Sequence, residues 1–169
     1  MVRPILKLGA PLLTTPSAAV ETITGDTQAL IDDLIETMHA APGIGLAAPQ
    51  LGVRQRVFVL DLSVGRRAED LAVCINPHVL SREGLQLEEE GCLSVPGFTA
   101  SVLRPARIAV SATTREGAVR TIEGSGLLAR ALQHEIDHLD GMLYLHRLRS
   151  IQRVIIERRV RTLERQGRW

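Results

Sequence analysis

Residues 133–141 read QHEIDHLDG, the most informative stretch of the chain, and contain the pattern HExxH. Residues four apart on a helix lie one above the other on the same face. His134 and His138 can therefore present two imidazoles to one metal ion. Glu135 projects from the neighbouring position, where it can hold a metal-bound water without being a ligand itself. This arrangement is what a metal-assisted hydrolase needs.

Outward from this segment, hydrophobic periodicity predicts further helices. Apolar residues at helical spacing predict a helix over 26–40 that ends at Pro42-Gly43. Ser125 is a candidate N-cap for the HExxH helix, which should end at Gly141. A last helix over about 150–166 carries arginines on one side and, on the other, Ile151, Val154, Ile155 and Leu163.

Segments rich in β-branched residues lie between these helices. Strands are predicted over 55–62 and 72–76, and a hairpin over 106–113 and 117–122. Strands clustered between separated helices predict an α+β fold. We expect antiparallel strands packed around a central HExxH helix, with an N-terminal helix and a C-terminal amphipathic helix.

Composition limits the class of protein. A chain of 169 residues with 45% hydrophobic and 23% charged residues predicts one globular domain. A formal charge of +1 gives no overall field for nucleic acid or membranes, and four aromatic residues argue against a base-stacking platform. Two cysteines cannot form a disulfide framework, and MVRPILKLGAPLL lacks the apolar run of a signal peptide. A soluble cytoplasmic protein is therefore expected.

A catalytic metal of this kind needs a third protein ligand. His146 follows the helix too closely for the metzincin pattern, and Glu157 and Glu164 lie on the arginine-rich last helix. Upstream, Cys92 stands beside a glycine in the turn-rich stretch EGCLSVPG (90–97), where a thiolate could reach a metal. A cysteine on its own is more often a small buried apolar residue, which is our interpretation of Cys74.

A third stretch, GIGLAAPQ (43–50), combines two glycines with a terminal amide. The glycines allow close approach of the backbone to a ligand, and Gln50 offers a donor that can polarise a carbonyl. On its own this stretch is better interpreted as a glycine-rich loop entering a strand. A phosphate site is not indicated, because neither a Walker lysine nor GxGxxG is present.

Taken together, GIGLAAPQ (43–50), EGCLS (90–94) and QHEIDHLDG (133–141) resemble the three motifs of the peptide deformylase family. The resemblance extends over essentially the whole chain. It implies an enzyme that removes the N-formyl group from the N-terminal formyl-methionine of newly synthesised proteins, releasing formate. Residues 1–148 would form the metal-dependent catalytic domain. Residues 149–169 would form an arginine-rich helix packed on, or extending from, that domain.

The resemblance also implies the roles of individual residues. Cys92, His134 and His138 would be the metal ligands, and the ion in the family is commonly Fe(II), with Zn, Ni or Co able to occupy the same site. Glu135 would activate the metal-bound water. The oxyanion would be stabilised by the side-chain amide of Gln50 and by the backbone N–H of Leu93.

Further implied residues surround the substrate. A pocket for the methionine side chain would lie near Ile44, Leu127, Ala131 and His134, with a backbone contact at Gly45. Glu90 would pair with Arg104, and Asp137 would either orient a neighbour or be solvated.

One departure from the family pattern and one cluster of charge bear on what the protein binds. Thr99 stands where many family members carry an arginine that helps to hold the peptide, so peptide preference is expected to differ. From Arg147 to Trp169 the net charge is +6. This segment is either a solvated amphipathic helix or a contact to ribosomal RNA. No membrane or DNA partner is expected.

Two other functions fit the same residues. One is a metallopeptidase or amidase that uses the same HExxH helix. The other is a non-catalytic paralogue that binds N-terminal peptides. The cysteine ligand and Gln50 argue against the first, and the intact Glu135 with all three ligands argues against the second.

Overall fold

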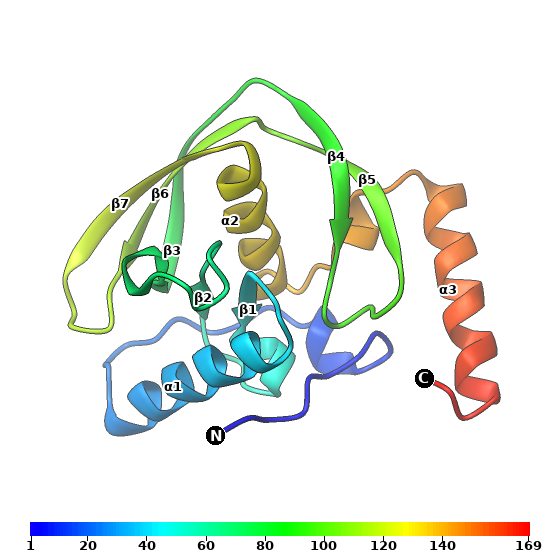
Figure 1. The fold of residues 1–169 in the computed structure, drawn as a ribbon, viewed down its shortest axis with the longest axis horizontal. Coiled ribbons are helices and arrows are strands. Elements are labelled where there is room, and N and C mark those ends of the chain that lie inside the picture. Colours follow the sequence, from blue (N-terminus) through cyan, green and yellow to red (C-terminus); the bar gives the residue numbers. More distant parts are fainter.

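The computed structural model describes residues 1–169 and contains three α-helices and two antiparallel sheets (Figure 1). The helices are α1 (Gly25–Ala40), α2 (Gly126–Leu139) and α3 (Ser150–Arg165). The strands are β1 (Gly45–Ala47), β2 (Val57–Leu60), β3 (Ala72–Glu83), β4 (Gln86–Gly91), β5 (Thr99–Arg104), β6 (Arg107–Thr113) and β7 (Val119–Ser125). The predicted α+β fold is confirmed. None of the three helices combines the length and the apolar character that a membrane span requires.

The main sheet has five strands in the order β1-β2-β3-β6-β7, and every neighbouring pair is antiparallel. Strands β4 and β5 form a separate two-stranded ribbon. The chain passes from β3 to β4 and back from β5 to β6 at one end of the molecule, so the ribbon arches over α2 (Figure 1). The segment 92–98 joins the two strands of the ribbon.

Two hydrophobic cores lie on opposite faces of the main sheet, and strand β2 is buried on both of its faces. Phe58 and Leu60 pack in the cluster that contains Leu132, Ile136 and Leu139 of α2. The alternate residues of β2, Val57 and Val59, pack in the cluster that contains Leu30, Ile31, Leu34 and Met38 of α1. Since successive strand residues point to opposite faces, one short apolar strand serves both helices.

A third core lies behind the ribbon and holds α3. It contains Val95, Val102, Leu143, Tyr144, Leu145, Ile156 and Val160. The apolar stripe predicted for this helix was wrong at three of its four residues: Ile151, Val154 and Ile155 are 70%, 48% and 53% exposed, whereas Leu163 is half-buried. The buried face of α3 is the neighbouring one, because the ribbon and the short helix at Tyr144–Arg147 meet it there.

Other local differences have simple causes. The sequence did not predict β1, which has only three residues, or the two strands of the ribbon, β4 and β5. The residues of β4, QLEEEG, lack apolar alternation. Ser125 precedes α2 in an extended conformation, but its side chain makes no capping hydrogen bond. Gly141 ends α2 as predicted, with a left-handed φ of 73°.

Candidate active site

Helix α2 presents His134 and His138 from one face, as their spacing predicted. Their ring centres lie 4.9 Å apart. The orientation of the helix is fixed because Leu132, Ile136 and Leu139 are buried against the main sheet. The face that carries the two histidines is thereby turned toward the ribbon.

Cys92 follows the last residue of β4 and brings a thiol to this pair. Its Sγ lies 3.3 Å from Nε2 of His138, and one ligand atom from each of the three residues falls within 4.8 Å of the others. A thiolate with two imidazoles suits iron, zinc or nickel, and three protein ligands leave a position for a reactant. The residues therefore fit a catalytic divalent metal ion. The other cysteine, Cys74, is fully buried, and burial raises the pKa of its thiol to about 12.

A buried group of charged side chains supports His134. Oε2 of Glu90 lies 3.0 Å from Nδ1 of His134, which leaves Nε2 of that ring for a metal. Glu90 is paired with Arg104, and Nη1 of Arg130 lies 3.3 Å from its Oε1. The pairing of Glu90 with Arg104 expected from the sequence is thus present. The Glu90 carboxylate, held by these arginines, orients the imidazole of His134, as carboxylates do behind other metal-bound histidines.

The same group extends to Asp137, which is buried and not solvated. Its carboxylate accepts hydrogen bonds from Arg104 at 2.9 Å and from Arg147 at 2.6 Å. Asp137 therefore neutralises an arginine that would otherwise face only Glu90. Of the two interpretations of this residue, the structure shows the orienting one.

The electrostatics favour a charged Glu90 and a neutral His138. Burial alone would raise the pKa of Glu90, but hydrogen bonds from Arg104 and His134 lower it to about 2. Burial and the positive charges of His134 and Arg104 hold the pKa of His138 well below 6.5. A neutral imidazole has the lone pair that a metal ligand requires.

Glu135 has the environment of a proton acceptor. It is 4% exposed, and its Oε2 has no hydrogen-bond partner in the protein. Burial raises the pKa of Glu135 to about 7. The carboxylate lies directly against Gly45 of β1, where a Cβ would come within 2.8 Å of Cδ. A glycine is therefore required at this position for the carboxylate to lie where it does.

Gln50 and Leu93 supply donors on the other side of the cysteine. Oε1 of Gln50 accepts the N–H of Ala47 at 2.9 Å, which turns the amide nitrogen toward Ser94 Oγ at 3.1 Å and Cys92 Sγ at 3.8 Å. The N–H of Leu93 makes no hydrogen bond within the protein. Both residues line the same cavity.

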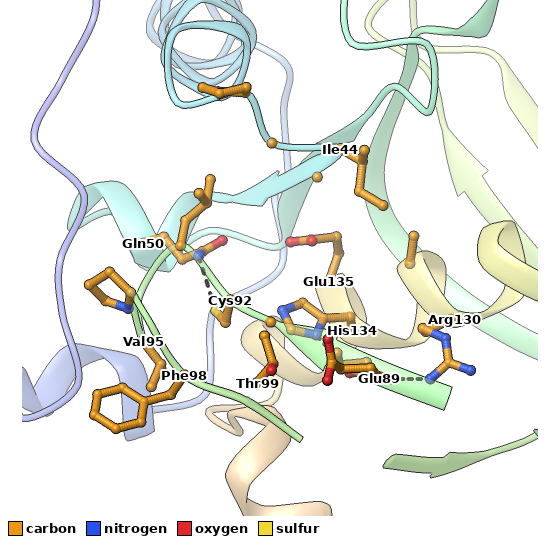
Figure 2. Close-up of a pocket in the computed structure, with 18 of the residues that line it drawn as sticks. Ile44, Gln50, Glu89, Cys92, Val95, Phe98, Thr99, Arg130, His134 and Glu135 are labelled. Carbon is orange, nitrogen blue, oxygen red and sulfur yellow. Dashed lines mark hydrogen bonds and ion pairs between the residues drawn. The ribbon is translucent and has the colours of Figure 1, made fainter. Parts of the chain in front are cut away.

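This cavity has a volume of about 570 Å³ and gathers all three sequence motifs. Figure 2 shows Glu135, His134 and Cys92 in its middle, Ile44 and Arg130 toward one end, and Val95 and Phe98 toward the other. Its lining includes every remaining residue proposed from the sequence for substrate contact, namely Gly45, Leu127 and Ala131. His138 alone among the proposed site residues lies behind this lining, in contact with Cys92.

Among the lining residues that sequence reasoning missed are Arg130 and Phe98. Arg130 is 5% exposed and binds the carbonyl of Glu88 at 3.0 Å and Oε1 of Gln86 at 2.7 Å. Its position, one helical turn before His134, was a signal that could have found it. Phe98 lies in the segment between β4 and β5, and nothing in its local sequence marks it.

Comparison with known proteins gives one family. The family model described as polypeptide deformylase matches residues 2–154. A peptide deformylase from Acidobacterium capsulatum is 44% identical over 169 residues, with coverage of 100% of this chain and 99% of the relative. One from Acetivibrio thermocellus is 48% identical over 159 residues, with coverage of 94% and 91%.

Solved structures of peptide deformylases are also similar to this chain. A crystal structure of a peptide deformylase from Legionella pneumophila has a TM-score of 0.93 and 40% identity, covering 100% of this chain and 99% of that one. The peptide deformylase from Ehrlichia chaffeensis in complex with actinonin has a TM-score of 0.89 and 37% identity, covering 97% and 98%.

Proposed function

Because this chain belongs to the peptide deformylase family and is an enzyme of that type, we propose that it hydrolyses the N-formyl group of N-terminal formyl-methionine in newly synthesised proteins and releases formate. One observation carries the proposal. Cys92, His134 and His138 converge to within 4.8 Å beside a buried, unpartnered carboxylate oxygen of Glu135. Metal-dependent amide hydrolysis needs these groups together.

We propose Cys92, His134 and His138 as the ligands of one divalent ion, Fe(II) in the cell, with Zn, Ni or Co able to use the same donors. When bound, such an ion would polarise the formyl carbonyl and lower the pKa of water at the site. Glu90 contributes by holding the ring of His134 through Nδ1. The metal content of anaerobically purified protein tests the assignment of iron.

Glu135 is the proposed general base and acid. It accepts a proton as the water oxygen bonds to the formyl carbon, and it returns that proton to the amine nitrogen as the carbon–nitrogen bond breaks. The products are formate and a free N-terminal amine. A pKa near 7, raised by burial, is suited to both transfers at neutral pH.

Gln50 and Leu93 are the proposed oxyanion donors. The amide nitrogen of Gln50 is aimed toward Cys92 because its carbonyl is held by Ala47. The N–H of Leu93 has no partner in the protein. Both can therefore donate to the carbonyl oxygen as negative charge develops on it, without first giving up a bond to the protein backbone.

The end of the cavity at Ile44 is the proposed site of the methionine side chain (Figure 2). Leu127 and Ala131 are the other apolar lining residues proposed to contact it. Gly45 places backbone beside the same space, where an extended peptide could pair with it. A formyl carbon carries only hydrogen, so a cramped centre admits it and excludes bulkier acyl groups.

Formate release from a formyl-Met tripeptide tests the function. Protein purified anaerobically and loaded with Fe(II) or Ni(II) should turn over, and Glu135→Gln at equal metal content should lose about 10²–10⁴-fold in rate. Glu123→Gln, an exposed substitution on β7, is the matched control. Cleavage of internal peptide bonds without formate release would instead indicate a metallopeptidase. Binding without turnover at full metal occupancy would contradict the proposal.

Residues 149–169 are proposed to act as an appendage of a catalytic domain formed by 1–148, meeting ribosomal RNA in the cytoplasm. Arg158, Arg161 and Arg165 of α3 are exposed, whereas Ile156 and Val160 anchor the helix in the third core. Changing these three arginines to glutamine removes charge while leaving the anchor. Co-sedimentation with ribosomes should weaken and become less sensitive to salt. Unchanged co-sedimentation and salt dependence would refute the contact.

A further inference from the structure

Trp169, the only tryptophan in the chain, touches the wall of the cavity from outside. Its ring centre lies 6.1 Å from that of Phe98, with the planes tilted by 58°. Its Nε1–H donates to the carbonyl oxygen of Leu8 at 3.0 Å. In Figure 1 the chain after α3 turns back toward the N-terminal segment and the junction of β4 and β5.

The wall that Trp169 touches runs from Val95 to Thr99, and other parts of the protein hold its backbone. The N–H of Leu8 donates at 2.8 Å to the carbonyl of Ser94, the residue just before this wall, and Tyr144 Oη donates at 3.0 Å to the carbonyl of Phe98 within it. These bonds fix the path of the segment but do not involve the Phe98 side chain. Only packing determines where that ring lies.

The ring of Phe98 packs at the edge of the third core, lines the cavity and lies beside Trp169. Tilted aromatic pairs at this separation attract each other beyond their simple burial. Trp169 is itself held by the hydrogen bond to Leu8, and the ammonium of Lys7 lies 5.6 Å from its ring centre. A restrained tryptophan is thus positioned to restrain the phenylalanine.

We propose that Trp169 is a positioning residue for the peptide substrate. It holds Phe98 in place, and Phe98 forms the wall that receives the part of the peptide beyond the formylated residue. This inference rests on the proposed function, which places the formyl group beside Glu135 and the methionine side chain beside Leu127. Phe98 lies toward the opposite end of the cavity from Ile44 and Arg130 (Figure 2).

Kinetics provide the first test. For a formyl-Met tripeptide, Trp169→Ala should raise KM by about 2- to 12-fold, the factor that one aromatic pair supplies, with kcat changed less than about 2-fold. For formyl-Met amide, which ends before the wall, KM should stay the same. Trp169→Phe retains an aromatic ring and should recover most of the tripeptide KM. Leu80→Ala, at an apolar residue that is 58% exposed on β3, is the control for loss of surface.

Fluorescence provides the second test, because a single tryptophan gives an unambiguous signal. Titrating the metal-loaded enzyme with the unformylated product tripeptide should change the emission of Trp169 along the same isotherm that calorimetry gives for binding. In Phe98→Leu the peptide should still bind, more weakly, and the emission change should disappear.

The outcomes separate this inference from the proposed function. If native enzyme releases formate while folded Trp169→Ala keeps the native KM for the tripeptide, the positioning role is refuted and the function stands. If peptide binds and the emission of Trp169 does not respond, the role is refuted independently of any variant. If no formate is released at full metal occupancy, the proposed function fails. The emission titration with the tripeptide still shows whether bound peptide affects Trp169 through Phe98.

Discussion

Replacing Gly45 with alanine tests the placement of the catalytic carboxylate by adding a single methyl group. In the native protein Glu135 lies against the α-carbon of this glycine, and an added Cβ would lie 2.8 Å from Cδ of the carboxylate. Gly45 does not have a positive φ, so alanine fits its backbone conformation. The strand should therefore form, and the carboxylate should have to move.

The size of the effect follows from this distance. Ordinary contacts of a Cβ begin at 3.4 Å, so the carboxylate must shift by an appreciable fraction of an ångström. A displacement of about 1 Å in a reacting group costs on the order of 100-fold in rate, and we expect kcat to fall about 10- to 100-fold. The three atoms nearest to an added Cβ all belong to Glu135 and none to a proposed metal ligand, so metal affinity should be unchanged. Stability should change by less than about 1 kcal/mol.

The assay is formate release at saturating and limiting peptide, at measured metal content. Gly25→Ala, where a Cβ would meet nothing within 4 Å, is the matched control. In a Glu135→Gln background the Gly45→Ala change should have little further effect, because both substitutions act on one group. A kcat within 2-fold of native would refute the argument. A rise in KM at constant kcat would show that the glycine serves the peptide and not the base.

Three further substitutions probe the surroundings of the site. Glu90→Gln should weaken metal binding about 10- to 100-fold in chelator competition, since it loosens His134; unchanged affinity would contradict this. Asp61, 1% exposed, has a pKa that burial would raise but hydrogen bonds from Ser63 and other neighbours lower to about 2. The stabilisation that ionised Asp61 gives the folded protein is therefore complete above pH 3.8, the pKa of this group in the unfolded chain. It is lost as the pH falls through about 2. Asp61→Asn should destabilise the protein by about 1–3 kcal/mol at pH 7 in denaturant titrations, and the deficit should shrink in acid. Gly141→Ala places a Cβ 2.9 Å from backbone carbon of Thr14 at a φ of 73° and should cost more than about 2 kcal/mol in the same titration.

The sequence could predict those parts of the site that depend on local spacing. His134 and His138 lie one helical turn apart, and the helix itself is marked by its apolar period and by Gly141. Cys92 is a different case, because 41 residues separate it from His134 and no spacing rule connects a strand end to a helix face. Its place among the ligands was implied by family resemblance. The structure then brought the three ligand atoms together.

Burial accounts for most of what could not be predicted. Nothing in the run Glu88-Glu89-Glu90 itself marks one carboxylate for burial, and the pairing of Glu90 with Arg104 was implied only by the family resemblance. Glu90 is 5% exposed because arginines meet it from β5 and α2. On α3, two apolar stripes compete. One contains Ile151 and Ile155, and the other contains Ile156 and Val160. Only the tertiary position of the ribbon decides that the second is buried.

The candidate metal site lies where two separately packed parts of the molecule meet. Its histidines belong to α2, which packs on the main sheet, while Cys92 lies at the end of the ribbon, beside the third core. The ribbon is joined to α2 by the contacts of Glu90 and Arg104 with Arg130 and Asp137. Buried ion pairs add little net stability compared with apolar packing, but they impose direction and distance. A junction built from such pairs fixes the angle at which the thiol meets the imidazoles, which is what a three-ligand site requires of its fold.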